Sequence, residues 1–66
     1  MRVRARCFAT LRELSAARSD LDLPDGASVA DAWDALVVRH AGLLPHRPFT
    51  QPARNGSAVS WDEALA

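Results

Sequence analysis

The clearest structural signal in the chain lies in residues 28–41, which read SVADAWDALVVRHA. Apolar side chains recur there at helical spacing, and the charged residues fall outside this stripe. The stripe consists of Val29, Trp33, Leu36, Val37 and His40. Ser28 is a good N-cap residue, and Asp31 stands near the positive end of the helix dipole. We therefore expect one long helix, with Gly42 just past its end and an apolar face that packs on another layer.

Two segments before this helix alternate between apolar and charged residues. Residues 1–9 alternate small apolar side chains with arginines, and residues 20–23 alternate aspartates with leucines. A period of two with one charged face is typical of a half-buried β-strand. The turn residues Pro-Asp-Gly at 24–26 end the second segment. If the two strands pair, arginines would lie beside aspartates, and each such pair would contribute about 0.2–1 kcal/mol.

The other segments carry weaker signals. Residues 10–13 have the spacing of a capping box and predict a helix of about two turns that ends near Arg18. Residues 43–52 contain three prolines and are predicted to form a loop. The Asn-Gly pair at 55–56 predicts a turn between two short strand pieces. Residues 60–63 repeat the capping-box spacing and predict a last helical turn.

The order of these elements predicts the fold class. It runs strand, short helix, strand, long helix, loop and two short strand pieces, which indicates an α+β domain with one main helix on a small mixed sheet. A chain of 66 residues has room for one such domain. The sheet looks incomplete, because two clear strands and two weak pieces leave part of the helix stripe uncovered. We therefore expect residues 1–66 to form a single domain that lacks its last strand.

Composition excludes several classes of protein. Eight arginines balance eight acidic residues, and this zero net charge argues against a nucleic-acid partner. A single cysteine, Cys7, excludes an internal disulfide and favours an intracellular setting. The chain has no apolar run long enough for a membrane span or a signal peptide. We expect a cytoplasmic protein with neither a nucleic-acid nor a membrane partner.

Few side chains suggest chemistry. Cys7, on the apolar face of the first strand, is more typical of a small buried residue than of a reactive thiol. A zinc site formed by Cys7, His40 and His46 is not expected, because structural zinc sites have four ligands, commonly in closely spaced pairs. There is no Ser-His-Asp arrangement, acid–base carboxylate pair or phosphate-binding loop. We expect no catalytic residue, no cofactor and no bound metal.

Three aromatic residues are candidates for docking a partner. Phe8, Phe49 and Trp61 qualify because aromatic side chains are enriched among the residues that dominate interface energies. For Phe8, a place in the core is an equal alternative. A stripe that binds an anion or RNA, or that meets an acidic patch of a partner, could be formed by Arg2, Arg4, Arg6 and Arg12. A solvated face paired with aspartates is the better interpretation, since no aromatic platform is interleaved with them.

Three further segments are characteristic when taken together. They are residues 7–14 (CFATLREL), 23–31 (LPDGASVAD), and 54–56 (RNG) with 59–65 (VSWDEAL). In this order they resemble the sulfur-carrier (small) subunits of molybdopterin synthase. The resemblance implies a ubiquitin-like β-grasp fold and a role in molybdenum cofactor biosynthesis. In those carriers a C-terminal Gly-Gly tail is adenylated, converted to a thiocarboxylate and inserted into the large subunit, which receives the sulfur.

The partners that the resemblance implies are proteins. They are the molybdopterin synthase large subunit and a ubiquitin-activating-enzyme-like adenylyltransferase. The chain would be a carrier with no catalytic residues of its own. An exposed sheet edge would also allow self-association, since unpaired strand edges recruit other strands.

The chain departs from those carriers at residues 64–66, which read Ala-Leu-Ala in place of a final strand and Gly-Gly tail. We therefore expect a molybdopterin synthase carrier without its thiocarboxylate-bearing tail. Two alternatives stay open: a non-catalytic β-grasp interaction module that has lost sulfur transfer, and the related sulfur carrier of thiamine biosynthesis. Thiamine carriers usually join their first two strands by a tight turn. The helix expected from residue 10 onward favours the molybdopterin branch.

Overall fold

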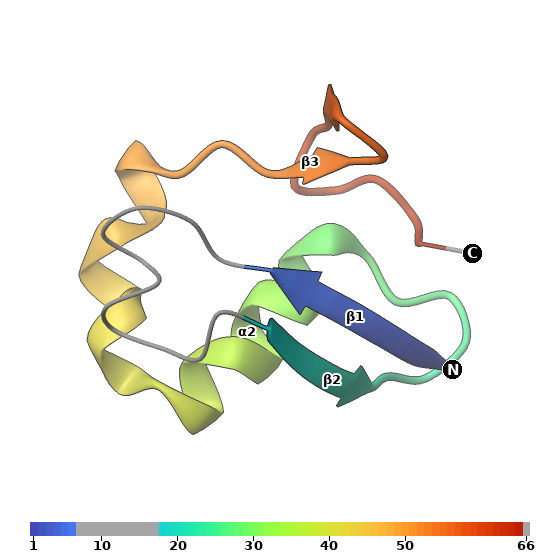
Figure 1. The fold of residues 1–66 in the computed structure, drawn as a ribbon, viewed down its shortest axis with the longest axis horizontal. Helices are drawn as coiled ribbons and strands as arrows, with labels where there is room; N and C mark the ends of the chain where they lie inside the picture. The colour runs from blue at the N-terminus through green and yellow to red at the C-terminus, as the bar shows by residue number, and fades with distance from the viewer. Residues whose placement is uncertain (7–17, 66) are drawn as a thin grey trace.

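The computed structural model describes residues 1–6 and 18–65 (Figure 1). The elements within these residues are, in chain order, β1 (Arg2–Arg6), β2 (Arg18–Asp22), α2 (Val29–Arg39), the 3-10 helix η1 (Ala41–Phe49), β3 (Ala53–Arg54) and β4 (Ser57–Ala58). One α-helix packs against a strand pair, and a small hairpin lies on the far side of β1 from β2 (Figure 1). This arrangement confirms the predicted α+β class.

The first two strands pair as their charge pattern predicts. They run antiparallel, with Arg2 opposite Asp22 and Arg4 opposite Asp20. The Nε atoms of these arginines lie 3.8 and 3.5 Å from the carboxylates of their partners. All four side chains are exposed, so each pair contributes no more than about 1 kcal/mol. In this register the apolar side chains of both strands share the face toward α2.

The core lies between that face and α2. Its buried apolar residues are Leu21, Leu23, Ala27, Trp33, Leu36 and Leu43. Trp33 and Leu36 come from the predicted helix stripe, and Val29 and Val37 are partly buried beside them. The predicted orientation of the helix is therefore confirmed. Leu43 is fully buried and comes from η1, so this segment also contributes to the core.

Hydrogen bonds define both ends of α2. The Ser28 hydroxyl accepts from the Asp31 N–H at 3.2 Å, and the Asp31 carboxylate accepts from the Ser28 N–H at 2.8 Å, which completes a capping box. At the other end the His40 N–H donates to the Leu36 carbonyl at 2.8 Å. The prediction that Gly42 lies just past the helix end is wrong, because α2 stops before His40 and Gly42 lies inside η1.

The loop predicted for residues 43–52 is largely a 3-10 helix, and this prediction is also wrong. Pro45 and Pro48 lie inside η1. Proline is compatible with a 3-10 helix because its fixed φ falls in the range of that helix. Leu43 is buried against α2, and this tertiary contact makes the segment regular although its composition favours a loop.

The β3–β4 hairpin confirms the predicted turn. Asn55 and Gly56 have φ values of 52° and 82°, and a tight hairpin turn of this kind requires positive φ at both central positions. Ala53 pairs with Ala58 across the turn. Each strand is two residues long, and the hairpin forms a pair that is separate from β1–β2.

Residues 60–63 form a single hydrogen-bonded turn, as predicted, but no helix follows. The Glu63 N–H donates to the Ser60 carbonyl at 3.2 Å, and Ala64 then makes an isolated bridge with the residue before α2. The Ser60 hydroxyl donates to the Asp62 carboxylate at 2.6 Å. This bond lowers the pKa of Asp62 below its ordinary value, because it favours the ionised carboxylate.

Several predictions fall on residues 7–17, which lie outside the described residues. They concern the end of the first strand, most of the short helix, Cys7 and Phe8. β2 begins at Arg18, where the sequence predicts the end of that short helix. Arg18 is instead a strand residue because it lies opposite Arg6 in the register of the two strands.

Truncating the core side of α2 tests this packing. Leu36→Ala removes a side chain that is 6% exposed, and we expect it to lower the free energy of unfolding by about 2–5 kcal/mol. Val38→Ala is the matched control, because Val38 on the same helix is 86% exposed. It should change stability by less than about 0.5 kcal/mol. Equal losses for the two variants in urea unfolding would contradict the orientation of α2.

The turn before α2 gives a second stability test. Gly26 has a φ of 86°, and a Cβ added there would meet no atom within 4 Å. Gly26→Ala should therefore destabilise only through its backbone conformation, by about 1–2 kcal/mol. Gly26→Asn should be milder, since asparagine adopts this conformation more readily. Thermal unfolding of the two variants and the parent chain measures these losses of stability. An alanine variant as stable as the parent chain would contradict the strained backbone conformation expected at Gly26.

Candidate partner-docking site

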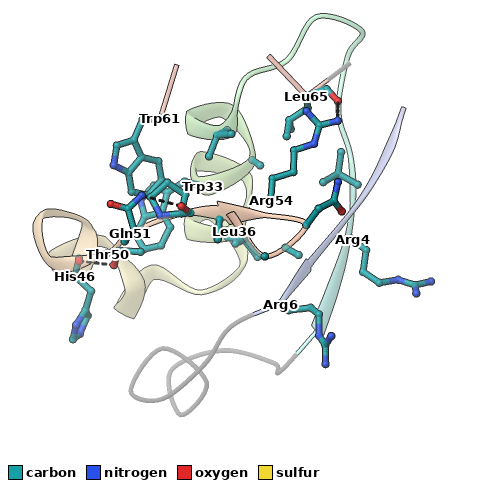
Figure 2. Close-up of a pocket in the computed structure, with 18 of the residues that line it drawn as sticks. Arg4, Arg6, Trp33, Leu36, His46, Thr50, Gln51, Arg54, Trp61 and Leu65 are labelled. Atoms are coloured by element: carbon teal, nitrogen blue, oxygen red, sulfur yellow. Dashed lines mark hydrogen bonds between the residues drawn. The ribbon is translucent and has the colours of Figure 1, made fainter. Parts of the chain in front are cut away.

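Two tryptophans form the centre of the candidate site. The rings of Trp33 and Trp61 meet edge to face, with centroids 5.5 Å apart and an interplanar angle of 73° (Figure 2). The Arg47 guanidinium lies 4.7 Å from the Trp61 ring centroid, within cation–π range. Trp61 is half-buried, so one side of its ring packs on the core while part of it stays exposed to solvent. A rigid aromatic with this partial exposure is well suited to contact a partner.

The segment that carries Trp61 is anchored to the start of α2. The first two N–H groups of the helix, from Val29 and Ala30, donate to the carbonyls of Glu63 (2.9 Å) and Trp61 (2.7 Å). Together with the Ser28 cap, these bonds satisfy donors that a helix otherwise leaves free. The helix end is therefore not available as an anion-binding site.

A second anchor comes from the hairpin. The Arg54 guanidinium donates to the carbonyls of Ala64 (3.3 Å) and Leu65 (2.9 Å), and it lies 3.8 Å from the Glu63 carboxylate. Figure 2 shows the Arg54 side chain reaching toward Leu65. Residues 61–65 are consequently held between the helix start and the hairpin.

A groove of about 1060 Å³ lies between β1 and the β3–β4 hairpin, and residues of α2 also line it (Figure 2). Its floor is apolar and includes Trp33, Leu36 and Leu65. The side chains that can carry positive charge along it are Arg2, Arg4, Arg6, His46 and Arg54. No aspartate or glutamate is found among the described residues that line it. Arg2, Arg4 and Arg54 are paired with Asp22, Asp20 and Glu63, so the apolar floor is the distinguishing feature of the groove.

The structure brings two of the three predicted docking residues to this groove. Phe49 is 90% exposed and lies at one end of η1, and Trp61 lies beside Trp33. Phe8 is outside the described residues. Docking by these side chains stays a prediction. Sequence reasoning missed the role of Arg54 because the hairpin and residues 61–65 meet only through the fold.

Other predicted features can be placed as well. His40 ends α2 through its backbone, and His46 is half-buried at the groove. Within residues 1–6 and 18–65, no three His, Cys, Asp or Glu side chains gather in a way that could hold a metal ion. Neither helix in this part of the chain is long and apolar enough to cross a membrane.

Comparison with known proteins identifies the family. Searches of the curated proteins and of the solved structures found no significant match. The sequence profile of the ThiS family, in contrast, matches residues 5–66, which include the end of β1 and all of β2, α2, η1, β3 and β4. Members of this family are sulfur carriers with a ubiquitin-like β-grasp fold, and they act together with a larger synthase or sulfurtransferase subunit. This chain belongs to the ThiS family of ubiquitin-like sulfur carriers.

Proposed function

We propose that the chain is the sulfur-carrier subunit of molybdopterin synthase and acts in molybdenum cofactor biosynthesis in the cytoplasm. Membership of the ThiS family over residues 5–66 supports sulfur carriage. One observation carries the finer assignment: the sequence of residues 7–14 (CFATLREL) resembles that of the molybdopterin carriers. The sequence from residue 10 onward predicts a capped helix, whereas thiamine carriers usually have a tight turn at this place.

In this role the domain is a co-substrate and supplies no catalytic side chain. The carrier carboxylate would be adenylated by a ubiquitin-activating-enzyme-like adenylyltransferase with release of pyrophosphate. A sulfur donor would then displace AMP and leave a thiocarboxylate, which the large subunit consumes. No side chain of residues 1–66 is assigned to these bonds. What the domain provides is a folded body with a docking surface that includes Phe49 and Trp61.

Residues 1–66 act in this proposal as a single, incomplete β-grasp domain. The strands of the described part form two separate pairs, β1 with β2 and β3 with β4. β1 therefore has one partner strand, and a groove lies along its other edge. This gap supports the proposal that the domain lacks its last strand.

Complementation tests the pathway. The natural reading frame would be expressed in two bacterial strains, one lacking the small subunit of molybdopterin synthase and the other lacking the thiamine sulfur carrier. We expect recovery of molybdenum-enzyme activity in the first strain and no thiamine-independent growth in the second. Recovery of the second strain alone would assign the chain to thiamine synthesis. Expression without recovery of either strain would favour the interaction module.

Docking is tested with the purified large subunit of molybdopterin synthase. Phe49→Ala should weaken binding about tenfold or more, since exposed aromatic anchors dominate many interfaces. Leu44→Ala is the matched control, because Leu44 lies in the same 3-10 helix and is 60% exposed, but does not line the groove. Calorimetric titration of the two variants distinguishes them. If Phe49→Ala bound the large subunit with unchanged affinity, Phe49 would not belong to the docking surface.

A further inference from the structure

The turn of the β3–β4 hairpin contains a reactive pair of residues. Asn55 is the only asparagine in the chain, and Gly56 follows it directly. The backbone nitrogen that follows an asparagine can attack the side-chain amide carbon and close a succinimide ring. Glycine hinders this attack least, because it has no Cβ. The sequence therefore places an electrophile and its nucleophile side by side at the turn.

The fold leaves both groups accessible. The hairpin lies at the edge of the molecule, and its residues 53–58 are all exposed (Figure 1). Within the described part of the chain, no hydrogen bond holds the side-chain amide of Asn55 or the N–H of Gly56. A Cβ built at Gly56 would meet no atom within 4 Å, so the surroundings do not crowd the nitrogen. Water, which the second step of the reaction consumes, has access to both residues.

The hairpin offers little resistance to the reaction. Ring closure needs rotation about the backbone bonds of Asn55, and this rotation opens the tight turn. Only two pairs of residues resist the opening, Ala53 with Ala58 and Arg54 with Ser57. Two-stranded pairs are at best marginally stable alone, so the turn opens locally at low cost.

The other residues that could react in this way are disfavoured. Gln51, the only glutamine, donates from Nε2 to the carbonyls of Pro52 (2.9 Å) and Val59 (3.0 Å). The nitrogen of the proline that follows it carries no hydrogen and cannot attack. Asp25 also precedes a glycine, but a carboxylate is a poorer electrophile than an amide. The reaction is therefore expected at one place in the chain.

We propose that Asn55 is a site of spontaneous deamidation, with the backbone nitrogen of Gly56 as the nucleophile. This nitrogen loses its proton to solvent and bonds to Cγ of Asn55. The bond from Cγ to the amide nitrogen breaks, and ammonia leaves. Water then opens the succinimide at either carbonyl, which yields aspartate or β-linked isoaspartate. The proposal goes beyond sulfur carriage and does not depend on the pathway.

The reaction changes the hairpin in charge and in geometry. Both products add a negative charge to a chain whose net charge is zero, and they place it next to Arg54. Isoaspartate also routes the backbone through the side-chain carbon, which lengthens the turn and disrupts the pairing of Arg54 with Ser57. Because Arg54 bonds the carbonyls of Ala64 and Leu65, deamidation also loosens the hold of the hairpin on residues 61–65.

The test follows the 66-residue chain during incubation at mildly alkaline pH, both folded and in urea. Anion exchange resolves the products by their added charge, and the tryptic peptide that begins at residue 55 locates them. Labelling with protein isoaspartyl methyltransferase identifies isoaspartate. We expect both products at residue 55 and an equal amount of released ammonia. The folded chain should react within about tenfold of the rate in urea, since local opening of the turn then costs no more than about 1.4 kcal/mol.

Two variants test the assigned roles. Gly56→Ala crowds the attacking nitrogen, and in urea, where folding has no effect on the rate, it should slow deamidation by at least about tenfold. Asn55→Gly keeps a turn sequence suited to positive φ and removes the electrophile, so its charge should not change during incubation. In the purified isoaspartate product, amide exchange at Ser57 should be at least about tenfold faster than in the parent chain.

Three results would overturn the proposal. The first is a folded chain that reacts more than about tenfold slower than in urea, which would show that the hairpin protects Asn55. The second is formation of aspartate without isoaspartate, which indicates direct hydrolysis of the amide and gives Gly56 no role. The third is a gain of charge by the Asn55→Gly variant as fast as by the parent chain, which would place the reaction at another residue.

Discussion

Burial of the apolar face of α2 is the interaction on which the rest of the molecule depends. Trp33 and Leu36 share one cluster with Leu21 of β2 and Leu43 of η1, so a single helix holds together segments from both halves of the chain. Each large apolar side chain buried there contributes about 1.5–3 kcal/mol. A domain of this size has few such contacts. The position of Trp61, and with it one side of the groove, follows from the contact that its ring makes with Trp33.

Features set by local spacing could be predicted from the sequence. The alternation around Val3 and Leu21 predicts two strands and their inner faces, and the Asn-Gly pair predicts the hairpin. Features set by distant contacts could not. η1 is regular because Leu43 is buried, and local composition does not encode that burial. The groove was not predictable either, since its walls come from opposite ends of the chain and meet only after α2 has packed.

The candidate site illustrates the difference between a fold and an activity. Trp61 and Phe49 could be named from their residue type alone, whereas Arg54 becomes relevant only through its bonds to Ala64 and Leu65. The chain belongs to a family of carriers, and a carrier presents its cargo to an enzyme. The body of such a protein is selected for recognition, and its surface chemistry is therefore the informative part.

The way residues 61–65 are fastened has a mechanical consequence. Their backbone bonds lead to the start of α2 and to Arg54, and Trp61 and Leu65 also pack against the core cluster. A load on Leu65 would therefore act both on a few hydrogen bonds and on these apolar contacts, so peeling of this segment would expose part of the core. Such peeling would uncap Val29 and Ala30 and separate the two indoles in a single event. The first turn of α2 and the contact between Trp33 and Trp61 are therefore coupled through residues 61–65.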